Sequence, residues 1–337
     1  MANTQRQPNI YDVARLAQVS HQTVSRVLNN NTSIRPETKT RVVKAMETLG
    51  YRPNQAARAL ASSKTKMLGI LSSDTDFTGP ASMVHEMEVA ARERGYFAVS
   101  CGVDPTNLAS VQGGIDHLMN LGVEGLAIVT PHADAVEYVR QQVVAIPVVS
   151  LDSMYRMDEL AVSVDNFSGA VAATEYLIEL GHRNIVHISG PNNWFESSTR
   201  AAGYTSTMLN ARLEPQIIEG DWEIQTGYRI AMDLAIESRG ITALFVANDR
   251  MALGIMSAMR KRGISVPERL SIIGFDDLPE TAFYWPPLTT VKQDFRQLGE
   301  RAMHLLMQEL EGKAVKKVDR LIPELVVRDS TTVVPKL

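Results

Sequence analysis

A short polar face near the N-terminus has side chains that could read DNA. Over residues 20–29 the apolar residues Val24, Val27 and Leu28 recur at helical spacing, and polar side chains fill the other positions. Glutamine can form two hydrogen bonds with adenine and arginine two with guanine, whereas short polar side chains more often hold phosphate. We therefore expect base contacts from His21, Gln22 and Arg26, and phosphate contacts from Ser25 and Asn29.

The flanking sequence predicts the helices that would present this face. Asn9 can cap a first helix whose apolar side is Ile10, Val13, Ala14 and Ala17. Val19 and Ser20 supply a tight turn, with Ser20 capping the second helix. Pro36 suits the start of a third helix, which Gly50 ends. Helix, turn and polar-faced helix together place a recognition helix in a major groove.

The charge distribution agrees with a DNA-binding N-terminus. Residues 1–66 hold 11 Lys and Arg against 3 Asp and Glu, a net charge of +8, while the rest of the chain has a net charge of −12. A small helical domain can be basic by chance, but here charge, helix spacing and polar face coincide. The N-terminal part is therefore expected to bind a polyanion and the remainder is not.

Composition limits the class of protein. The chain has 337 residues, 45% hydrophobic and 21% charged, which suits a small head and a two-lobed body. Its single cysteine, Cys101, excludes an intramolecular disulfide. No apolar run approaches the ~18 residues of a membrane helix, and the N-terminus has no signal-peptide core. We expect a cytoplasmic, nucleoid-associated protein with no membrane partner.

The remainder of the chain alternates strand-like and helical runs. Strands are expected over residues 67–71, 96–100, 125–129, 146–151, 161–164, 185–189, 216–219, 243–247 and 270–275. Helices are expected over residues 83–94, 108–121, 168–180, 200–210, 226–239 and 250–262. This alternation predicts two α/β halves with parallel sheets and helices on both faces. The strand at 146–151 should close the first half and the strand at 161–164 should open the second.

Polar residues just past strand ends are the candidates for a ligand site, since ligands of such folds bind at the carboxyl ends of strands. Carboxylates, an amide, a guanidinium and an aromatic face together suit a sugar, because they can bind its hydroxyls and cover its C–H face. The candidates lie at residues 74–77, 152, 221–222, 248–249 and 276–277, with Arg200 beside them. Aspartate at a strand end can instead cap the next helix, which we expect of Asp165 and Asp249.

Motifs for catalysis and cofactor binding are missing from the sequence. It contains no Gly-x-Gly-x-x-Gly or Walker loop, no Gly-x-Ser-x-Gly elbow, and no pair of histidines at metal-ligand spacing. No enzyme activity, cofactor or metal is therefore expected.

Two strings in the head are similar to a known family signature. Tyr11-Asp12-Val13-Ala14, followed by Val19-Ser20-x-x-Thr23-Val24-Ser25-Arg26-Val27, resembles the N-terminus of the LacI/GalR family of bacterial transcriptional repressors. The resemblance extends along the whole chain. It implies a helix-turn-helix head over residues 1–52, a hinge helix and linker over 53–66, and a periplasmic-binding-protein-like body over 67–331. The N-lobe would comprise about 67–164 and 295–322, and the C-lobe about 165–292 and 323–331.

The resemblance also assigns roles to residues. DNA contacts would come from Tyr11, Ser20, His21, Gln22, Thr23, Ser25, Arg26, Asn29, Asn54, Ala57 and Leu60. Leu60 would enter the minor groove from a hinge helix that forms only on DNA. Effector contacts would come from Phe77, Asp152, Arg200, Trp222, Asn248, Asp276, Gln293 and Phe295. A homodimer contact would use Phe283, Tyr284 and Trp285.

We expect a sugar-responsive repressor that a galactoside or β-glucoside releases from a palindromic operator. A purine-type corepressor is the alternative within the family. A sugar-binding transport receptor would need a signal peptide and no basic head, and a sugar-modifying enzyme would need paired catalytic carboxylates or a cofactor loop. Trp194 and Phe195 depart from the family's small residues, and they could either enlarge the sugar site or shield it.

Overall fold

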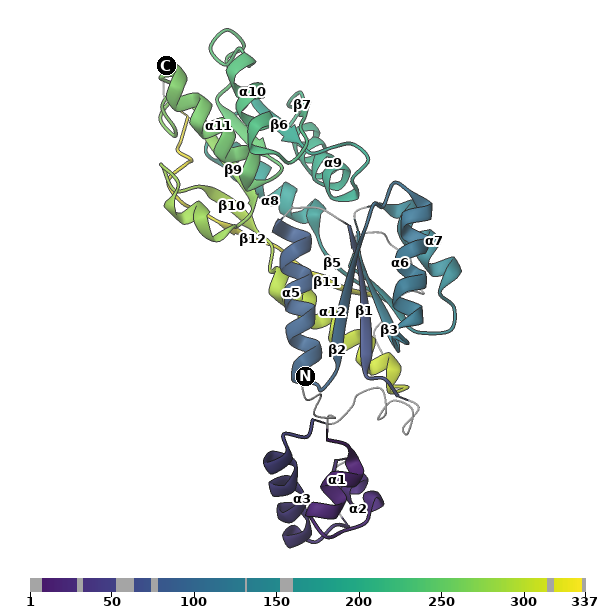
Figure 1. Cartoon of the computed structure of the whole chain (residues 1–337). Helices are drawn as coiled ribbons and strands as arrows, with labels where there is room; N and C mark the ends of the chain where they lie inside the picture. Colours follow the sequence, from purple (N-terminus) through teal and green to yellow (C-terminus); the bar gives the residue numbers. More distant parts are fainter. Residues whose placement is uncertain are drawn as a thin grey trace, which may run out of the picture. The chain divides into compact units, whose positions relative to one another are not determined.

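The structure is a computed structural model that describes residues 8–28, 33–52, 64–73, 78–130, 132–151, 160–313 and 318–334. The chain divides into two compact units, Met1–Thr65 and Lys66–Leu337, called here the head and the body (Figure 1). Six residues with expected roles lie outside the described residues: Asn29, Asn54, Ala57, Leu60, Phe77 and Asp152.

The head consists of helices α1 (Ile10–Leu16), α2 (His21–Leu28) and α3 (Pro36–Leu49). A capping box starts α1, because the Asn9 side chain accepts from the Asp12 backbone and the Asp12 side chain accepts from the Asn9 backbone. Ser20 caps α2 as expected, since its Oγ accepts a 3.1 Å hydrogen bond from the Thr23 backbone. Gly50 ends α3 in a left-handed conformation with a φ of 62°.

The three head helices enclose one apolar core. Its centre is formed by Val13, Val24 and Val42, one from each helix and all fully buried. Burial of Val24 and Val27 turns the other side of α2 outward, and His21, Gln22 and Arg26 are exposed there. Helix spacing thus separates the core face of α2 from its polar face.

The first lobe of the body is built on a six-stranded parallel sheet. Its order is β11 (Val318–Leu321), β5 (Leu160–Val164), β4 (Val148–Leu151), β3 (Gly125–Val129), β1 (Met67–Ser73) and β2 (Phe97–Val103). Helices α5 (Thr78–Glu93) and α12 (Phe295–Leu310) supply one apolar cluster of this lobe, and α6 (Leu108–Asn120) and α7 (Ala133–Gln142) supply another. Helices α7 and α12 were not among the helices expected from the sequence.

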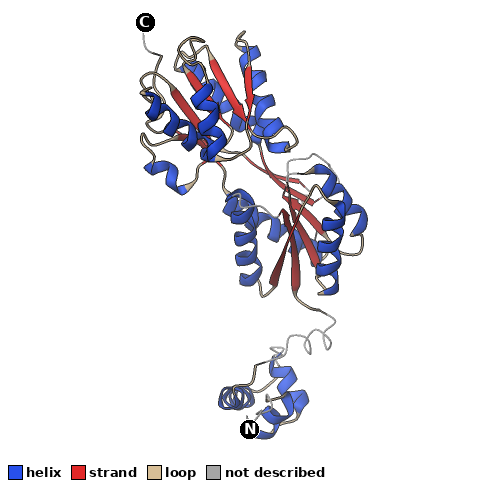
Figure 2. Cartoon of the chain, turned by 45° about the horizontal axis from the view of Figure 1, so that its top comes forward, coloured by secondary structure: helices blue, strands red, loops and turns tan. Residues whose placement is uncertain are grey.

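The second lobe has a six-stranded sheet of the same kind. Its order is β12 (Glu324–Val326), β10 (Thr289–Lys292), β9 (Ser271–Asp276), β8 (Ala243–Val246), β6 (Ile185–Ser189) and β7 (Gln216–Glu219). All its neighbours are parallel except β10 and β12. Helices α8 (Asn166–Glu179) and α9 (Phe195–Asn210) contribute to one core cluster, and α10 (Ile224–Asp233) and α11 (Asp249–Arg262) contribute to the other. Figure 2 shows both sheets in red between blue helices.

One expectation about the two halves is wrong. The strand at 161–164 does not open the second half, because β5 pairs with β4 and β11 in the first sheet. An apolar strand followed by a helix occurs in either lobe, so the local pattern could not show where the chain changes sheets. The chain passes between the lobes after β5, after β10 and after β11. These three connections are close in space although distant in sequence, and they adjoin the carboxyl ends of the strands.

Close helix packing fixes the start of α11, which borders the site described below. A Cβ atom on Gly254 of α11 would lie 2.0 Å from the Ile224 backbone oxygen, and one on Gly227 of α10 would lie 2.3 Å from the Met251 oxygen. Any larger residue would push these helices apart, so both glycines are needed for their contact. No helix of the described residues is long and apolar enough to span a bilayer.

Candidate functional site

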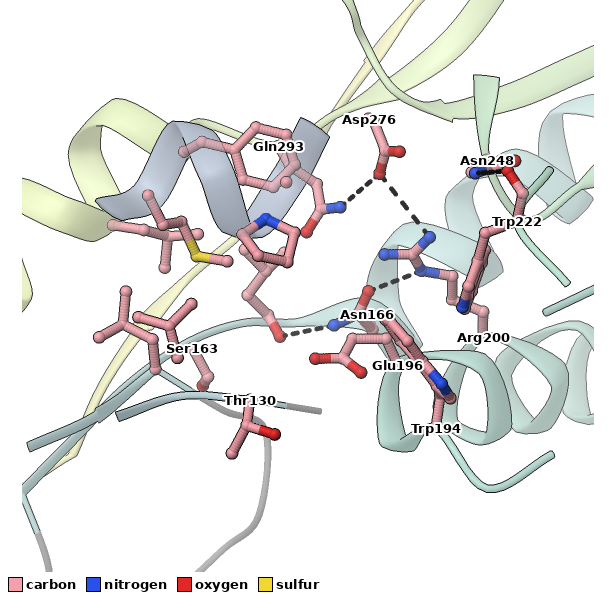
Figure 3. Close-up of a pocket in the computed structure, with 18 of the residues that line it drawn as sticks. Thr130, Ser163, Asn166, Trp194, Glu196, Arg200, Trp222, Asn248, Asp276 and Gln293 are labelled. Carbon is pink, nitrogen blue, oxygen red and sulfur yellow. Dashed lines mark hydrogen bonds and ion pairs between the residues drawn. The ribbon is translucent and has the colours of Figure 1, made fainter. Parts of the chain in front are cut away.

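A pocket lies between the two lobes of the body, beside the carboxyl ends of their strands (Figure 3). It encloses about 880 Å³, including the part open to solvent. The first lobe contributes mainly apolar side chains: Pro80, Met83, Val129, Leu151, Val162, Val164, Phe295 and Leu298, with Thr130 and Ser163. The second lobe and the connection after β10 contribute mainly polar or aromatic side chains: Asn166, Trp194, Glu196, Arg200, Trp222, Asn248, Arg250, Asp276 and Gln293. A ligand here would meet one polar and one apolar wall.

Arg200 is the most firmly held charged group of the pocket. It lies within α9 rather than at its start, and it is only 3% exposed. Its Nε donates a 2.8 Å hydrogen bond to Asn166, and Nη1 donates to the Ala247 carbonyl. The guanidinium carbon lies 3.8 Å from the centre of the Phe275 ring. Burial lowers the pKa of Arg200, and the nearby Asp276 carboxyl opposes that effect.

Asp276 stands opposite Arg200 at the end of β9. Its Oδ1 lies 3.8 Å from Arg200 Nη1 and accepts a 2.6 Å hydrogen bond from the Gln293 side chain (Figure 3). Its backbone has a φ of 116°, a conformation that is strained for a residue with a side chain. Burial raises the pKa of Asp276 to about 6, while Arg200 and Gln293 act to lower it. Strain and desolvation at one residue are typical of functional sites.

The raised pKa of Asp276 predicts a pH dependence of stability. The folded-state pKa of about 6 lies above the ordinary value of 3.8, so ionisation destabilises the fold as pH rises between these values. In the wild type, the free energy of unfolding should fall by on the order of 1–3 kcal/mol as the pH rises through this range. Asp276→Asn should not show this fall, because asparagine does not ionise. Urea unfolding of both proteins at about pH 4 and about pH 7 measures it. An identical pH dependence in both would contradict this assignment.

Trp222 lies beside Arg200, but its ring is too enclosed to give a sugar a full stacking surface. It is 5% exposed, with a φ of 75°, and its guanidinium neighbour Arg200 lies 5.6 Å from its ring centre. A Cβ atom on Gly190 would lie 2.1 Å from the indole, so this ring packs directly on the Gly190 backbone. The indole Nε1 is buried and donates to no described residue. Trp222 therefore offers the pocket only a small part of its surface, and its buried N–H is not among the groups presented there.

Asn248, not Asp249, caps α11, which corrects the expectation for Asp249. The Asn248 Oδ1 accepts a 2.9 Å hydrogen bond from the Met251 backbone, and its Nδ2 donates to the Trp222 carbonyl. Asp249 is fully buried behind the pocket, where it accepts from the Leu278 backbone and from Thr290 Oγ1. Burial and the nearby Asp276 raise its pKa well above the ordinary value. Asp165 does cap its helix, α8, as expected.

Two candidate aspartates lie away from the pocket lining. Asp221 accepts from the Glu223 backbone and from Thr226 Oγ1, so it stabilises the start of α10. Asp277 forms a 2.6 Å ion pair with Arg328. Whether a residue just past a strand end points into the pocket depends on the side chains around it. The residue type alone does not predict this direction.

Other lining residues were missed from the sequence. Asn166 and Thr130 lie just past the ends of β5 and β3, so the strand-end rule could have found them, whereas Glu196 lies in the first turn of α9. Asn166 is nearly fully buried and holds Arg200, while Arg250 pairs with Glu223 at 3.1 Å. The described residues include no group of three His, Cys, Asp or Glu side chains that could hold a metal ion.

The polar face of the head also assembles as a group. His21, Gln22 and Arg26 are exposed on α2, and the Tyr11 ring, 59% exposed, lies 5.2 Å from the His21 ring. The hydroxyls of Ser20 and Thr23 lie 2.9 Å apart, and Ser25 is half-buried. The described part of the expected DNA-contacting set therefore occupies one end and one side of α2.

The three aromatic residues expected at a dimer contact follow β9. Phe283 and Trp285 are 87% and 86% exposed, whereas Tyr284 between them packs against the core of the second lobe. The three residues therefore do not act alike: Phe283 and Trp285 extend into solvent and Tyr284 anchors the loop.

Comparison with known proteins gives two family matches. Residues 9–54 match the bacterial regulatory proteins of the lacI family, and residues 174–331 match the periplasmic binding protein-like domain. The lactose operon repressor of Escherichia coli is 33% identical over 329 residues, which cover 97% of this chain and 91% of that protein. The HTH-type transcriptional repressor PurR of Haemophilus influenzae is 33% identical over 332 residues, covering 95% and 98%.

A solved structure extends the likeness to three dimensions. The lac repressor dimer bound to operator and the anti-inducer ONPF matches with a TM-score of 0.89 and 32% identity, covering 97% of this chain and all of that one. Both relatives by sequence are named as repressors of transcription rather than as enzymes. The fold class expected from the sequence is thereby confirmed. The chain belongs to the lacI family of bacterial regulatory proteins, whose members are DNA-binding transcriptional repressors.

Proposed function

We propose that this repressor responds to a sugar, and that a galactoside or β-glucoside bound in the pocket releases it from a palindromic operator. The observation that supports this most is the group of Arg200, Asp276 and Gln293 on one wall, facing apolar side chains on the other. Guanidinium, carboxylate and amide groups can bind neighbouring hydroxyls with fixed geometry. The apolar wall suits the C–H face of a sugar and a less polar aglycone.

The pocket's position between the lobes explains how binding could act at a distance. A ligand held by Arg200 on one lobe and packed on Met83 and Phe295 of the other would favour one arrangement of the lobes. Only a ligand with different affinities for the two arrangements can shift the equilibrium between them. We propose that the arrangement favoured by sugar is the one with low operator affinity. The protein would then act in the cytoplasm, where it meets both operator and sugar.

Ligand binding to the purified protein tests the chemical class. We expect calorimetric titration to show binding of a galactoside or a β-glucoside. The same titration with purine bases should show no binding. Binding of a purine alone would favour the second candidate, a purine-type corepressor. The 33% identity to the repressor named PurR favours that candidate. Binding followed by chemical change of the sugar would support an enzyme instead, and mass analysis of the recovered ligand detects such change.

The repressor binds operator DNA as a dimer, and we propose that Phe283, Tyr284 and Trp285 lie at the dimer contact, mainly through the exposed Phe283 and Trp285. Exposed aromatic clusters commonly mark interfaces, and both side chains are almost fully exposed in the single chain. Phe283→Asp combined with Trp285→Asp should raise the dimer dissociation constant about 100-fold or more. Sedimentation over a concentration series measures this change. The monomer's thermal stability should stay close to wild type, because neither side chain packs in the core.

Tyr284→Ala is the matched control for the dimer variants. Tyr284 packs against the second lobe, so its loss should lower thermal stability more than it weakens association. A double-aspartate protein that remained a dimer at the lowest measurable concentration would refute this interface.

A further inference from the structure

Trp194 is the aromatic side chain with the most open surface among those that line the polar wall of the pocket. It is half-buried, whereas its neighbour Trp222 is 5% exposed and packs on Gly190. Trp194 stands at the start of α9, two residues before Glu196 and six before Arg200, and all three line the pocket (Figure 3). Part of its indole therefore lines the same pocket as the Arg200 guanidinium.

The two tryptophan rings face different directions. Their centres are 5.5 Å apart and their planes are inclined by 59°. Aromatic contact with a sugar needs the two rings roughly parallel at about 3.5–4 Å between carbon atoms. Because Trp222 is enclosed, the stacking surface of this wall belongs to Trp194, which lies six residues before Arg200 on the chain. A second ring, joined to the first by a rotatable glycosidic bond, can lie along Trp194 while the first stays beside Arg200 and Asp276.

The other lobe supports Trp194 from the side. His132, just before α7, meets the indole with ring centres 6.0 Å apart and planes at 65°, an edge-to-face arrangement. This edge-to-face contact restrains the indole, which also packs against the apolar core of the second lobe. Glu196, on the same helix turn, adds a carboxylate that can accept hydroxyl hydrogen bonds from a second ring.

We infer that Trp194 forms a second-ring subsite, so that the preferred effector is a two-ring glycoside: a disaccharide or an aryl glycoside. This inference rests on the proposed sugar response and names the class of sugar. Arg200, Asp276 and Gln293 would bind the first ring. Trp194 would bind the second sugar or the aromatic aglycone. A purine, or a sugar of one ring, would leave this subsite unused.

Matched pairs of ligands test the subsite in the full-length protein. One pair is methyl β-galactoside and o-nitrophenyl β-galactoside, and the other is methyl β-glucoside and cellobiose. We expect the wild type to bind the two-ring member of its preferred pair about tenfold or more tightly than the one-ring member. Trp194→Ala should reduce that ratio to about one, mainly by weakening the two-ring ligand, and Trp194→Phe should retain part of it.

Phe195→Ala is the matched control, because Phe195 is adjacent in sequence but does not line the pocket. It should keep the wild-type ratio. An unchanged ratio in Trp194→Ala, with one-ring sugars still bound, would refute the subsite and leave the proposed sugar response intact. If neither member of either pair bound the wild type, the proposed sugar response would fail, and the subsite with it.

Discussion

Asp276→Asn should leave operator affinity unchanged and raise the sugar concentration that releases the operator by about one to two decades. Asp276 is the acceptor that completes the Arg200 and Gln293 group, and it belongs to the body, whereas the polar face of α2 belongs to the head. Loss of one hydrogen bond to a charged group costs about 1.5–3 kcal/mol, which is about one to two decades of sugar affinity. Asparagine keeps the size and shape of the aspartate side chain, so the change removes the charge with little change in packing.

Two titrations decide this prediction. Sugar affinity is measured on the free protein, and the sugar concentration that releases half the operator is measured on the complex. Asp277→Asn is the control, since Asp277 is the next residue and pairs with Arg328 outside the pocket lining. Both quantities should shift together in Asp276→Asn and stay near wild type in Asp277→Asn. A sugar response of ordinary strength in Asp276→Asn would remove Asp276 from the site.

Gln22→Ala should change which DNA sequences the head selects. Gln22 is exposed on α2 next to His21, and its amide can form two hydrogen bonds with an adenine edge. Loss of such a pair costs about 1–3 kcal/mol of discrimination at one base pair, and other positions should keep their preference. Selection from a random DNA pool, followed by sequencing, compares the base frequencies selected by variant and wild type.

Ser25→Ala separates base reading from phosphate binding on the same helix. Ser25 is half-buried and is expected to hold a phosphate, so its loss should weaken binding to all sequences alike. Its selected pool should therefore match that of the wild type. If the Gln22→Ala pool were also unchanged, Gln22 would not read a base.

Much of the fold follows from patterns that act within one helix or strand. Apolar spacing, caps and glycine stops predict the head, and short apolar strands alternating with helices predict the parallel sheets. The sheet to which β5 belongs does not follow, because its Leu160–Val164 sequence suits either lobe and only the pairing with β4 and β11 decides. Helices α7 and α12 were both missing from the helices expected from the sequence, and in α7 half of the 10 positions are polar.

The sequence predicted many of the residues that line the pocket, but not the directions of their side chains. Polar residues after strand ends led to Asp276, Asn248 and Trp222, which all line it. The same rule suggested Asp221 and Asp277, whose carboxylates turn to Thr226 and Arg328 instead. The enclosure of Trp222 depends on the absent side chain of Gly190, 32 residues earlier, and no local pattern contains that information.

Sugar binding in this pocket should lower operator affinity, and a titration of the operator complex measures this effect. The wild-type protein is bound to an operator selected from random DNA and titrated with one-ring and two-ring galactosides and β-glucosides, and separately with purine bases. We predict that a glycoside releases the DNA at concentrations that match its affinity for the free protein, and that purines have no effect. Tighter DNA binding with a purine, and no release by any sugar, would contradict the account.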